Sequence, residues 1–347
     1  SEPAGSRLLS VLLAKGGPEE IREAFADPRP GLRAAAATAA RTLLEKSTWM
    51  EPAEQTALAD RLRPGLEVLV NDDVPLVAIP AVVALQRMGD VRGISRLERI
   101  YHAGDLGTKA AVAEALGDMP AEEAWPFFSL ILGEERDPQS GLVRAAALRG
   151  LAKTKHPQAV GLLVFYLLSD QNRSVRVAAA EALVDDGGEE ARYAVIKALT
   201  EGQPDPVKRA RLVDTLGRFQ GTGVRDVLMS YLEDPDRTVA HIAALRLADH
   251  NEASTVPYLI EILRGKSPSL AQAALRALEN VSCVRFDASG HEVLAEHYER
   301  WYQTARITSA GQPDRVWFRK ALRKRGYDVS PVSYTHLTLP TNVQQCS

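Results

Sequence analysis

The sequence predicts an all-α protein built from stacked pairs of short helices. A leucine recurs at nearly constant spacing, each time at the end of an alanine-rich stretch: Leu85, Leu116, Leu151, Leu183, Leu216, Leu247 and Leu278. The intervals are 31, 35, 32, 33, 31 and 31 residues, and Ala40 holds the equivalent place 45 residues before the first. No stretch before residue 329 alternates polar and apolar residues over the length of a strand. A repeat of this length, made of two amphipathic helices, is typical of stacked helical architectures.

The second helix of each pair is clearest at residues 170–183, where the chain reads Asp-Gln-Asn-Arg-Ser-Val-Arg-Val-Ala-Ala-Ala-Glu-Ala-Leu. Its apolar residues fall at helical spacing on one stripe, which predicts that this stripe faces a partner helix. Similar stretches follow Asp27-Pro28, Asp137-Pro138 and Asp234-Pro235. The small alanine side chains in the middle of the stripe let neighbouring helices approach closely.

The turn before each second helix carries Asp or Asp-Pro. Such a residue stops the preceding helix and caps the next one, because its carboxylate accepts backbone N–H groups and favours the positive helix end. A base follows the turn, and we expect it to bridge to the Asp of an adjacent pair. The combination occurs as Asp27/Arg33, Asp137/Arg144, Asp170/Arg176 and Asp205/Arg209, and it is lost where Ala78, Ala240 and Ala271 replace the base.

The first helix of each pair has its own apolar stripe, for example Leu162, Leu163, Phe165, Tyr166 and Leu167. Helix breaks separate the pairs at residues 88–90, 117–120, 155–157, 186–188 and 220–223, which are rich in Gly, Pro and Asp. These features predict about eight hairpins and no second fold.

Residues 7–282 resemble the HEAT repeat, in the short bacterial variety also seen in phycobilisome-lyase-like proteins. The resemblance implies a right-handed α-α superhelix of about eight hairpins that is closed by a C-terminal helical cap. We assign residues 1–283 to the repeat array, 284–328 to the cap, and 329–347 to a non-native or disordered tail. HEAT repeats serve unrelated tasks, so the motif is specific for the fold and nearly silent about activity.

The predicted cap is basic and aromatic. Residues 284–328 hold nine Lys or Arg and six Asp or Glu, whereas residues 1–283 hold 33 bases and 39 acids. Helices are expected at about 290–305 and 313–325. One interpretation is a terminal cover with an apolar inner face. The other is a site for an anionic partner, made of bases and exposed rings, with Arg300, Trp301, Trp317, Arg319 and Arg323 as its candidate residues.

Residues 330–347 hold no Asp, Glu, Lys or Arg and differ from everything upstream, so we expect an adaptor-derived tail with poor packing. The chain begins at Ser1 rather than Met. We therefore expect a soluble protein that is either cytoplasmic or exported after signal removal. No apolar run approaches the length of a membrane span.

Motifs for chemistry are weak. His291 and His297 are six residues apart, which places them on different faces of a helix and argues against a shared metal. Residues 104–109 superficially suggest a phosphate loop, but Lys109 is not preceded by Gly and no strand leads in. There is no Gly-x-Ser-x-Gly elbow, and Cys283 and Cys346 have no recognisable His partner in the sequence. We therefore predict no catalytic residues, no metal site and no cofactor.

The second helices of such repeats line the concave face, so a partner is expected there. The residues five positions after the base position of each pair form one row on these helices. They are Thr38, Val83, Glu114, Arg149, Glu181, Asp214, Leu245 and Arg276. Of these, Glu114, Arg149, Glu181, Asp214 and Arg276 are the candidate contacts. Small side chains beside this charged ridge suit a helix or extended peptide, preferably a basic one.

The favoured function is a non-catalytic protein-interaction scaffold. One alternative is a HEAT-like enzyme of the DNA glycosylase or bilin lyase type. A glycosylase should present a basic surface, and the array is acidic, so nucleic acid is an unlikely partner. A further alternative is an anionic ligand or nucleic acid bound through the basic cap. The sequence predicts no oligomeric state.

Overall fold

The molecule is all-α over the residues that the computed structural model describes, namely residue 10 and residues 15–134, 137–185, 188–221, 223–282 and 284–304. These ranges contain 17 α-helices and five short 3₁₀ helices, and no β-strand. The predicted fold class is therefore confirmed. All seven recurring leucines are 0% exposed, as is Ala40.

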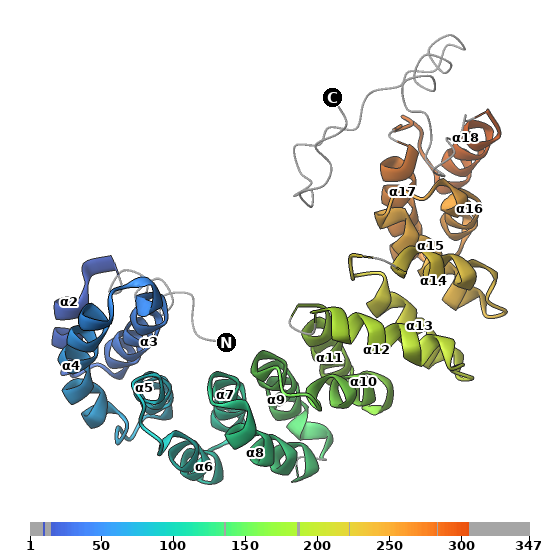
Figure 1. The fold of residues 1–347 in the computed structure, drawn as a ribbon. Coiled ribbons are helices and arrows are strands. Elements are labelled where there is room, and N and C mark those ends of the chain that lie inside the picture. Colours follow the sequence, from blue (N-terminus) through green and yellow to red (C-terminus); the bar gives the residue numbers. More distant parts are fainter. Residues whose placement is uncertain are drawn as a thin grey trace. The chain divides into compact units, whose positions relative to one another are not determined.

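Sixteen of these helices form eight consecutive pairs (Figure 1). The pairs are α2 (Pro18–Ala24) with α3 (Pro30–Lys46), α4 (Pro52–Leu69) with α5 (Pro75–Arg87), α6 (Gly93–Ala103) with α7 (Leu106–Ala115), α8 (Ala121–Glu134) with α9 (Gly141–Thr154), α10 (Ala159–Ser169) with α11 (Arg173–Asp185), α12 (Gly188–Thr200) with α13 (Pro206–Leu216), α14 (Val224–Ser230) with α15 (Arg237–Asp249), and α16 (Val256–Arg264) with α17 (Pro268–Ser282).

The remaining α-helix, α18 (His291–Thr304), coincides with the first helix predicted for the cap. The second predicted cap helix and the tail at 329–347 lie outside the described residues. The 3₁₀ helices are η1 (Ser47–Trp49), η2 (Leu116–Asp118), η3 (Pro138–Ser140), η4 (Tyr231–Glu233) and η5 (Ala253–Thr255).

The chain divides into two compact units, Ser1–Ala194 and Val195–Ser347, here called unit 1 and unit 2. The boundary falls inside α12. The predicted division at residue 283 is a sequence-based assignment that the helix contacts do not test.

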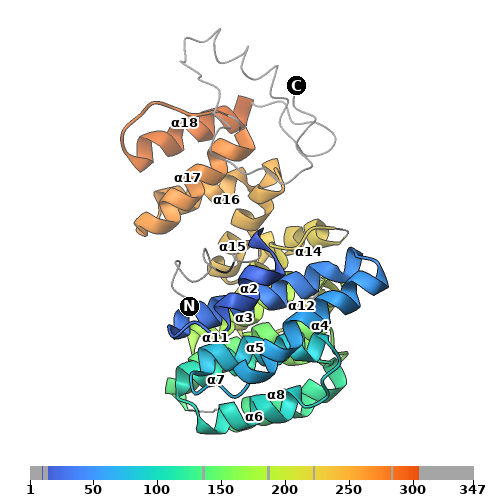
Figure 2. The same ribbon diagram turned by 90° about the vertical axis from the view of Figure 1, so that its left-hand side faces the viewer.

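Unit 1 has two layers of helices. The second helices α3, α5, α7, α9 and α11 contact one another in that order. Each first helix packs on the second helix of its own pair. Figures 1 and 2 show α5 and α7 in one layer and α6 and α8 in the other. Close contact is thus concentrated among the alanine-rich second helices.

Two glycines make the closest approach within unit 1 possible. A Cβ on Gly150 of α9 would lie 2.5 Å from the carbonyl oxygen of Ala113, in α7. A Cβ on Gly117, in η2, would lie 2.5 Å from the carbonyl oxygen of Gly150. Backbone therefore packs on backbone here, and any side chain would force the two helices apart.

Acidic caps are present at three second helices, but of the turn acids named from the sequence only Asp205 is one of them. The N-caps of α3, α9 and α15 are Arg29, Ser140 and Asp236 rather than Asp27, Asp137 and Asp234. The Asp105 carboxylate accepts a hydrogen bond from the Thr108 N–H at 2.8 Å. Asp205 accepts from the Val207 N–H, and Asp236 from the Thr238 N–H, both at 2.8 Å. These bonds satisfy backbone donors that the first turn of a helix leaves unpaired.

The predicted bridge from the base of one pair to the Asp of the next is confirmed in three places. The Nε atoms of Arg33, Arg144 and Arg209 donate to carboxylates of the following pair, to Asp72 at 2.7 Å, Asp170 at 2.9 Å and Asp234 at 2.9 Å, respectively. Hydrogen bonds from Arg33 hold the pKa of the Asp72 carboxyl below its usual value. One detail differs from expectation. Asp205 acts as a helix cap, and Gln203 occupies the position that Asp holds in the other turns.

Base and acid disappear together along the array. Ala78 replaces the base in one pair, and the residue at the acceptor position of the following pair is Ala103. Ala240 replaces the base in another pair, and Gly265 stands at the next acceptor position. An isolated guanidinium in a half-buried turn is costly, since its charge is desolvated without compensation. At these two junctions the repeats lack both halves of the bridge. Arg176 departs from this pattern, because Gln203 stands at the next acceptor position.

Candidate functional site

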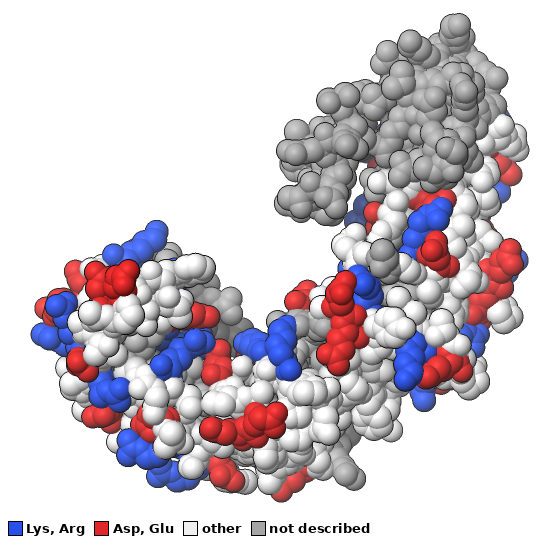
Figure 3. All heavy atoms as spheres, viewed as in Figure 1, with Lys and Arg blue, Asp and Glu red and all other residues white. Residues whose placement is uncertain are grey.

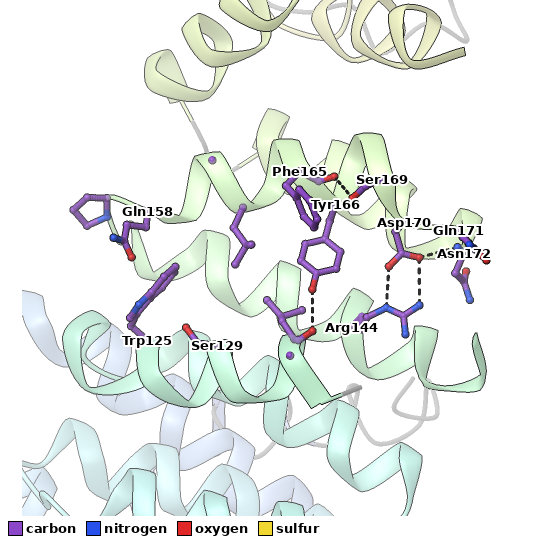
Figure 4. Close-up of a pocket in the computed structure, with 15 residues that line it drawn as sticks. Trp125, Ser129, Arg144, Gln158, Phe165, Tyr166, Ser169, Asp170, Gln171 and Asn172 are labelled. Atoms are coloured by element: carbon purple, nitrogen blue, oxygen red, sulfur yellow. Dashed lines mark hydrogen bonds and ion pairs between the residues drawn. The ribbon is translucent and has the colours of Figure 1, made fainter. Parts of the chain in front are cut away.

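An open trough lies on the first-helix side of unit 1. It has a volume of about 1440 Å³ and runs between α8 and α10 (Figure 4). Trp125 and Gln158 lie at one end, and Arg144 and Asp170 lie at the other. The lining residues are Trp125, Ser129, Leu132, Gly133, Arg144, Pro157, Gln158, Gly161, Leu162, Phe165, Tyr166, Ser169, Asp170, Gln171 and Asn172.

Glycines keep the walls of the trough open. Gly133 lies on α8 and Gly161 on α10, and a Cβ built on either would meet no atom within 4 Å. Tyr166 sets the spacing of the two helices, because its hydroxyl donates to the carbonyl oxygen of Leu132 at 2.9 Å. The same bond recurs in unit 2, where the Tyr231 hydroxyl donates to Leu199 at 3.0 Å. Burial raises the pKa of that Tyr231 hydroxyl.

Aromatic side chains form the walls. The Trp125 ring stacks on His156, with centroids 4.1 Å apart and planes 6° from parallel. Phe165 meets Tyr166 edge to face at 5.4 Å. Phe165 is nonetheless 57% exposed, although it lies in the middle of an otherwise apolar helix. An exposed ring in such surroundings is typical of a contact surface.

A buried ion pair closes the other end of the trough. The Arg144 guanidinium donates from Nε and Nη2 to the two oxygens of Asp170, at 2.9 and 3.2 Å. Its Nη1 donates to the carbonyl oxygen of Asp137 at 2.8 Å and to the Ser140 hydroxyl at 3.0 Å. The two side chains are only 6% and 7% exposed. The charged groups lining the trough therefore neutralise each other.

This arrangement suits the binding of apolar groups. The Ser169 hydroxyl is committed to the carbonyl oxygen of Phe165 at 2.7 Å. The His156 ring accepts the Gln158 N–H at 3.2 Å and stands 3.8 Å from the exposed Glu122 carboxylate. Among the described residues, no three His, Cys, Asp or Glu side chains are grouped as a metal site would need.

The second-helix row that the sequence proposed for a partner carries compensated charge. Glu114 stands 3.9 Å from Arg149 and 4.0 Å from Lys153. In unit 2, Asp214 pairs with Arg218 at 2.9 Å and with Arg246 at 2.6 Å. Figure 3 shows acidic and basic side chains side by side over the helices of unit 1, without a large region of one sign on the face it displays.

Two acids and one base of the row thus serve in ion pairs between or within repeats. Glu181 and Arg276 are exposed and have no ion pair within the described part of the chain. Val83 is 0% exposed, so it belongs to the core and not to a surface row. Thr38 and Leu245 are half-buried.

Two aromatic rings in the described part of the cap belong to the core. Trp301 is 1% exposed and Tyr298 is 0% exposed. The Tyr298 hydroxyl donates to the carbonyl oxygen of Val284 at 2.9 Å. The expectation of an exposed Trp301 ring is therefore wrong, because the ring packs inside. Arg300 is exposed and lies 3.5 Å from Glu296, whereas Trp317, Arg319 and Arg323 lie outside the described residues.

Sequence reasoning missed the trough. It took the apolar residues of α10 as one stripe that faces the core, whereas only Ala159, Leu163 and Leu167 of that helix are buried. The signal in the sequence was the number of apolar residues in α10. They occupy not only the stripe that faces the core but also the faces that solvent would be expected to cover.

Comparison with known proteins agrees with the repeat pattern. A model of HEAT repeats matches residues 131–211 and 193–279. A curated relative, deoxyhypusine hydroxylase-B of Oryza sativa subsp. japonica, is 27% identical over 226 residues, which cover 61% of this chain and 73% of the relative.

Three solved structures show limited similarity to this chain. Human deoxyhypusine hydroxylase in complex with glycerol is 18% identical, with a TM-score of 0.29, over 79% of this chain and 99% of that one. The CpcE and CpcF complex of phycocyanin lyase from Nostoc is 18% identical, with a TM-score of 0.34, over 82% and 93%. An engineered protein is 20% identical, with a TM-score of 0.32, over 88% and 87%.

No helix in the described ranges is both long and apolar enough to span a membrane. The matched residues and the eight helix pairs lead to one assignment. Residues 131–279 of this chain are HEAT repeats.

Proposed function

We propose that the protein is a non-catalytic interaction scaffold that holds an apolar segment of a partner protein in the trough between α8 and α10. The observation that supports this most is the trough itself, an open cavity of about 1440 Å³ with Phe165 exposed in it. Helices that lay an apolar face into a groove are a common mode of recognition. α10 has 11 residues and is therefore about 16 Å long, which matches three turns of such a helix.

The charge of the trough selects the partner. Its two charged lining residues, Arg144 and Asp170, are paired with each other. A charged partner side chain would lose its hydration there without gaining a counter-ion. Aliphatic or aromatic partner residues gain burial against Trp125, Leu162 and Phe165, and amide groups at the rim, such as Gln158 and Asn172, accommodate polar flanks.

A Phe165→Glu variant is expected to lose partner binding by at least about tenfold, because it places a charge in an apolar contact. Peptides selected from a random library on the wild-type protein provide the ligand, and fluorescence anisotropy provides the affinity. Tyr193→Glu is the matched control, since Tyr193 is an aromatic residue of unit 1 that is 73% exposed and does not line the trough. If the peptides bound Phe165→Glu with the same affinity as the wild type, the trough would not be the binding site.

A second contact at the second-helix row is supported by Glu181 in particular, because it is exposed and free of ion pairs within the described residues. Glu181→Lys is expected to weaken the binding of a basic partner and leave the fold intact.

Asp214→Lys is expected to destabilise unit 2 by about 1 kcal/mol, since it replaces two ion pairs by repulsion. Urea denaturation and partner affinity measured on both variants separate the two effects. Equal stability of the two variants would contradict the structural role of Asp214.

A further inference from the structure

The turns before the second helices contain a recurring guanidinium site. In each case the arginine that follows the turn donates from its Nη1 to at least one backbone carbonyl oxygen of that turn. Arg33 donates to Asp27 at 2.9 Å and to Pro28 at 3.1 Å. Arg176 donates to Asp170 at 2.9 Å and to Gln171 at 2.7 Å.

Arg209 repeats this geometry, and Arg144 keeps one of the two carbonyl contacts. Arg209 donates to the carbonyl oxygens of Gln203 at 2.9 Å and Pro204 at 2.8 Å. Arg144 donates to that of Asp137 at 2.8 Å. The turn is therefore shaped to receive a guanidinium, and four copies in this chain show it occupied by an arginine from the following helix.

At Ala78 the same turn has no arginine. A cavity of about 340 Å³ opens there, lined by residues of the turn, by Ala78 and by α6: Val70, Asn71, Asp72, Asp73, Pro75, Ala78, Arg96, Arg99, Ile100, Ala103 and Gly104. By the register of the repeat, the carbonyl oxygens of Asp72 and Asp73 correspond to those that hold Nη1 elsewhere. Neither of them accepts a hydrogen bond from any part of the chain that the structure describes.

One acid and one base that line the cavity are not engaged by other charged groups of the described residues. The Asp72 carboxylate is engaged by Arg33 at 2.7 Å, and Arg96 is engaged by Asp90 at 2.8 Å. Asp73 is exposed and has no ion pair within the described residues, and the other turns of this kind carry Pro, Gly, Gln or Lys at its position. Arg99 is exposed and also lines the cavity.

We propose that this cavity binds the guanidinium group of an arginine side chain on a partner protein. Two backbone carbonyl oxygens receive the guanidinium donors, and the Asp73 carboxylate supplies the counter-charge. Arginine fits better than lysine, because its planar fork reaches several acceptors at once. This proposal rests on the proposed scaffold function in one respect, namely that a partner protein supplies the arginine. The site itself is separate from the trough.

The test is a titration of the full chain with N-acetyl-arginine amide, followed by backbone amide shifts in NMR spectra. Saturable shifts are expected in residues 71–78 and 103–104, with N-acetyl-lysine amide binding several-fold more weakly. Ala78→Arg fills the cavity with the chain's own guanidinium and is expected to abolish these shifts. Asp73→Asn is expected to weaken binding by about tenfold, and Asp226→Asn, an exposed acid in unit 2, serves as the control with unchanged binding.

Absence of saturable shifts in the wild type, or equal binding by wild type and Asp73→Asn, would overturn the site. The Asp73→Asn comparison holds even if Ala78→Arg fails to fold. Because the probe is a single residue, the result does not depend on the trough. If Phe165→Glu lost peptide binding but still showed the NMR shifts on titration with N-acetyl-arginine amide, the two sites would be independent.

Discussion

Replacing Gly150 by alanine is expected to destabilise unit 1 by about 2–3 kcal/mol, even though alanine is the better helix former. The added Cβ would lie 2.5 Å from the carbonyl oxygen of Ala113 and 3.2 Å from that of Glu114. Both obstacles are backbone atoms of the neighbouring pair, so no side-chain rotation relieves the contact. The helices have to separate, and that loses packing along the whole α7–α9 contact. Urea denaturation followed by circular dichroism measures the loss.

Gly161→Ala is the matched control. Gly161 also lies inside a helix of unit 1, but a Cβ there meets nothing within 4 Å. The substitution is expected to stabilise the protein by about 0.5–1 kcal/mol, because it restricts the unfolded chain and favours the helix. If both variants were stabilised alike, the close approach of α7 and α9 would be wrong.

The second large effect is expected from Arg144→Ala, which should cost about 3–5 kcal/mol. The substitution leaves the Asp170 carboxylate 7% exposed without its counter-ion. It also removes donors from the carbonyl oxygen of Asp137 and from Ser140. An uncompensated buried charge is far more costly than the loss of an exposed pair.

Arg176→Ala provides the comparison for this effect. Arg176 also donates to its own turn, to the carbonyl oxygens of Asp170 and Gln171, but Gln203 replaces the carboxylate at the next acceptor position. Its loss is expected to cost about 1–2 kcal/mol, the amount associated with hydrogen bonds to a charged group. The double variant Arg144→Ala/Asp170→Ala should be less destabilised than the sum of its single variants. Additive losses would show that the two side chains do not act as a pair.

The sequence alone was sufficient for the helices and for the bridge between neighbouring pairs. The 31–35 residue spacing follows directly from the geometry of paired helices, and a buried base requires an acid nearby. The pairing of Arg33 with Asp72 could be predicted for this reason, since the turns that carry both residues are marked in the sequence. The turn acid before Arg209 was misidentified, because Asp205 caps the helix and Gln203 stands where the other turns carry Asp.

The trough could not be predicted, because it depends on the distance between two first helices. Phe165 and Leu163 have the same apolar character, yet the first is 57% exposed and the second 1% exposed. The apolar pattern of a single helix does not distinguish a side chain that packs in the core from one that is exposed in a cavity. The glycines on α8 and α10 and the Tyr166 bond to Leu132 decide the outcome, and these are tertiary features.

The most direct test of the account is photo-crosslinking from the trough. Benzoylphenylalanine placed at position 165 is irradiated in the presence of a peptide selected on the wild-type protein, and the same label at position 193 is the comparison. The scaffold hypothesis predicts a covalent peptide adduct at position 165 and none at position 193. An adduct at position 193 alone, or none at either position despite measurable binding, would contradict it.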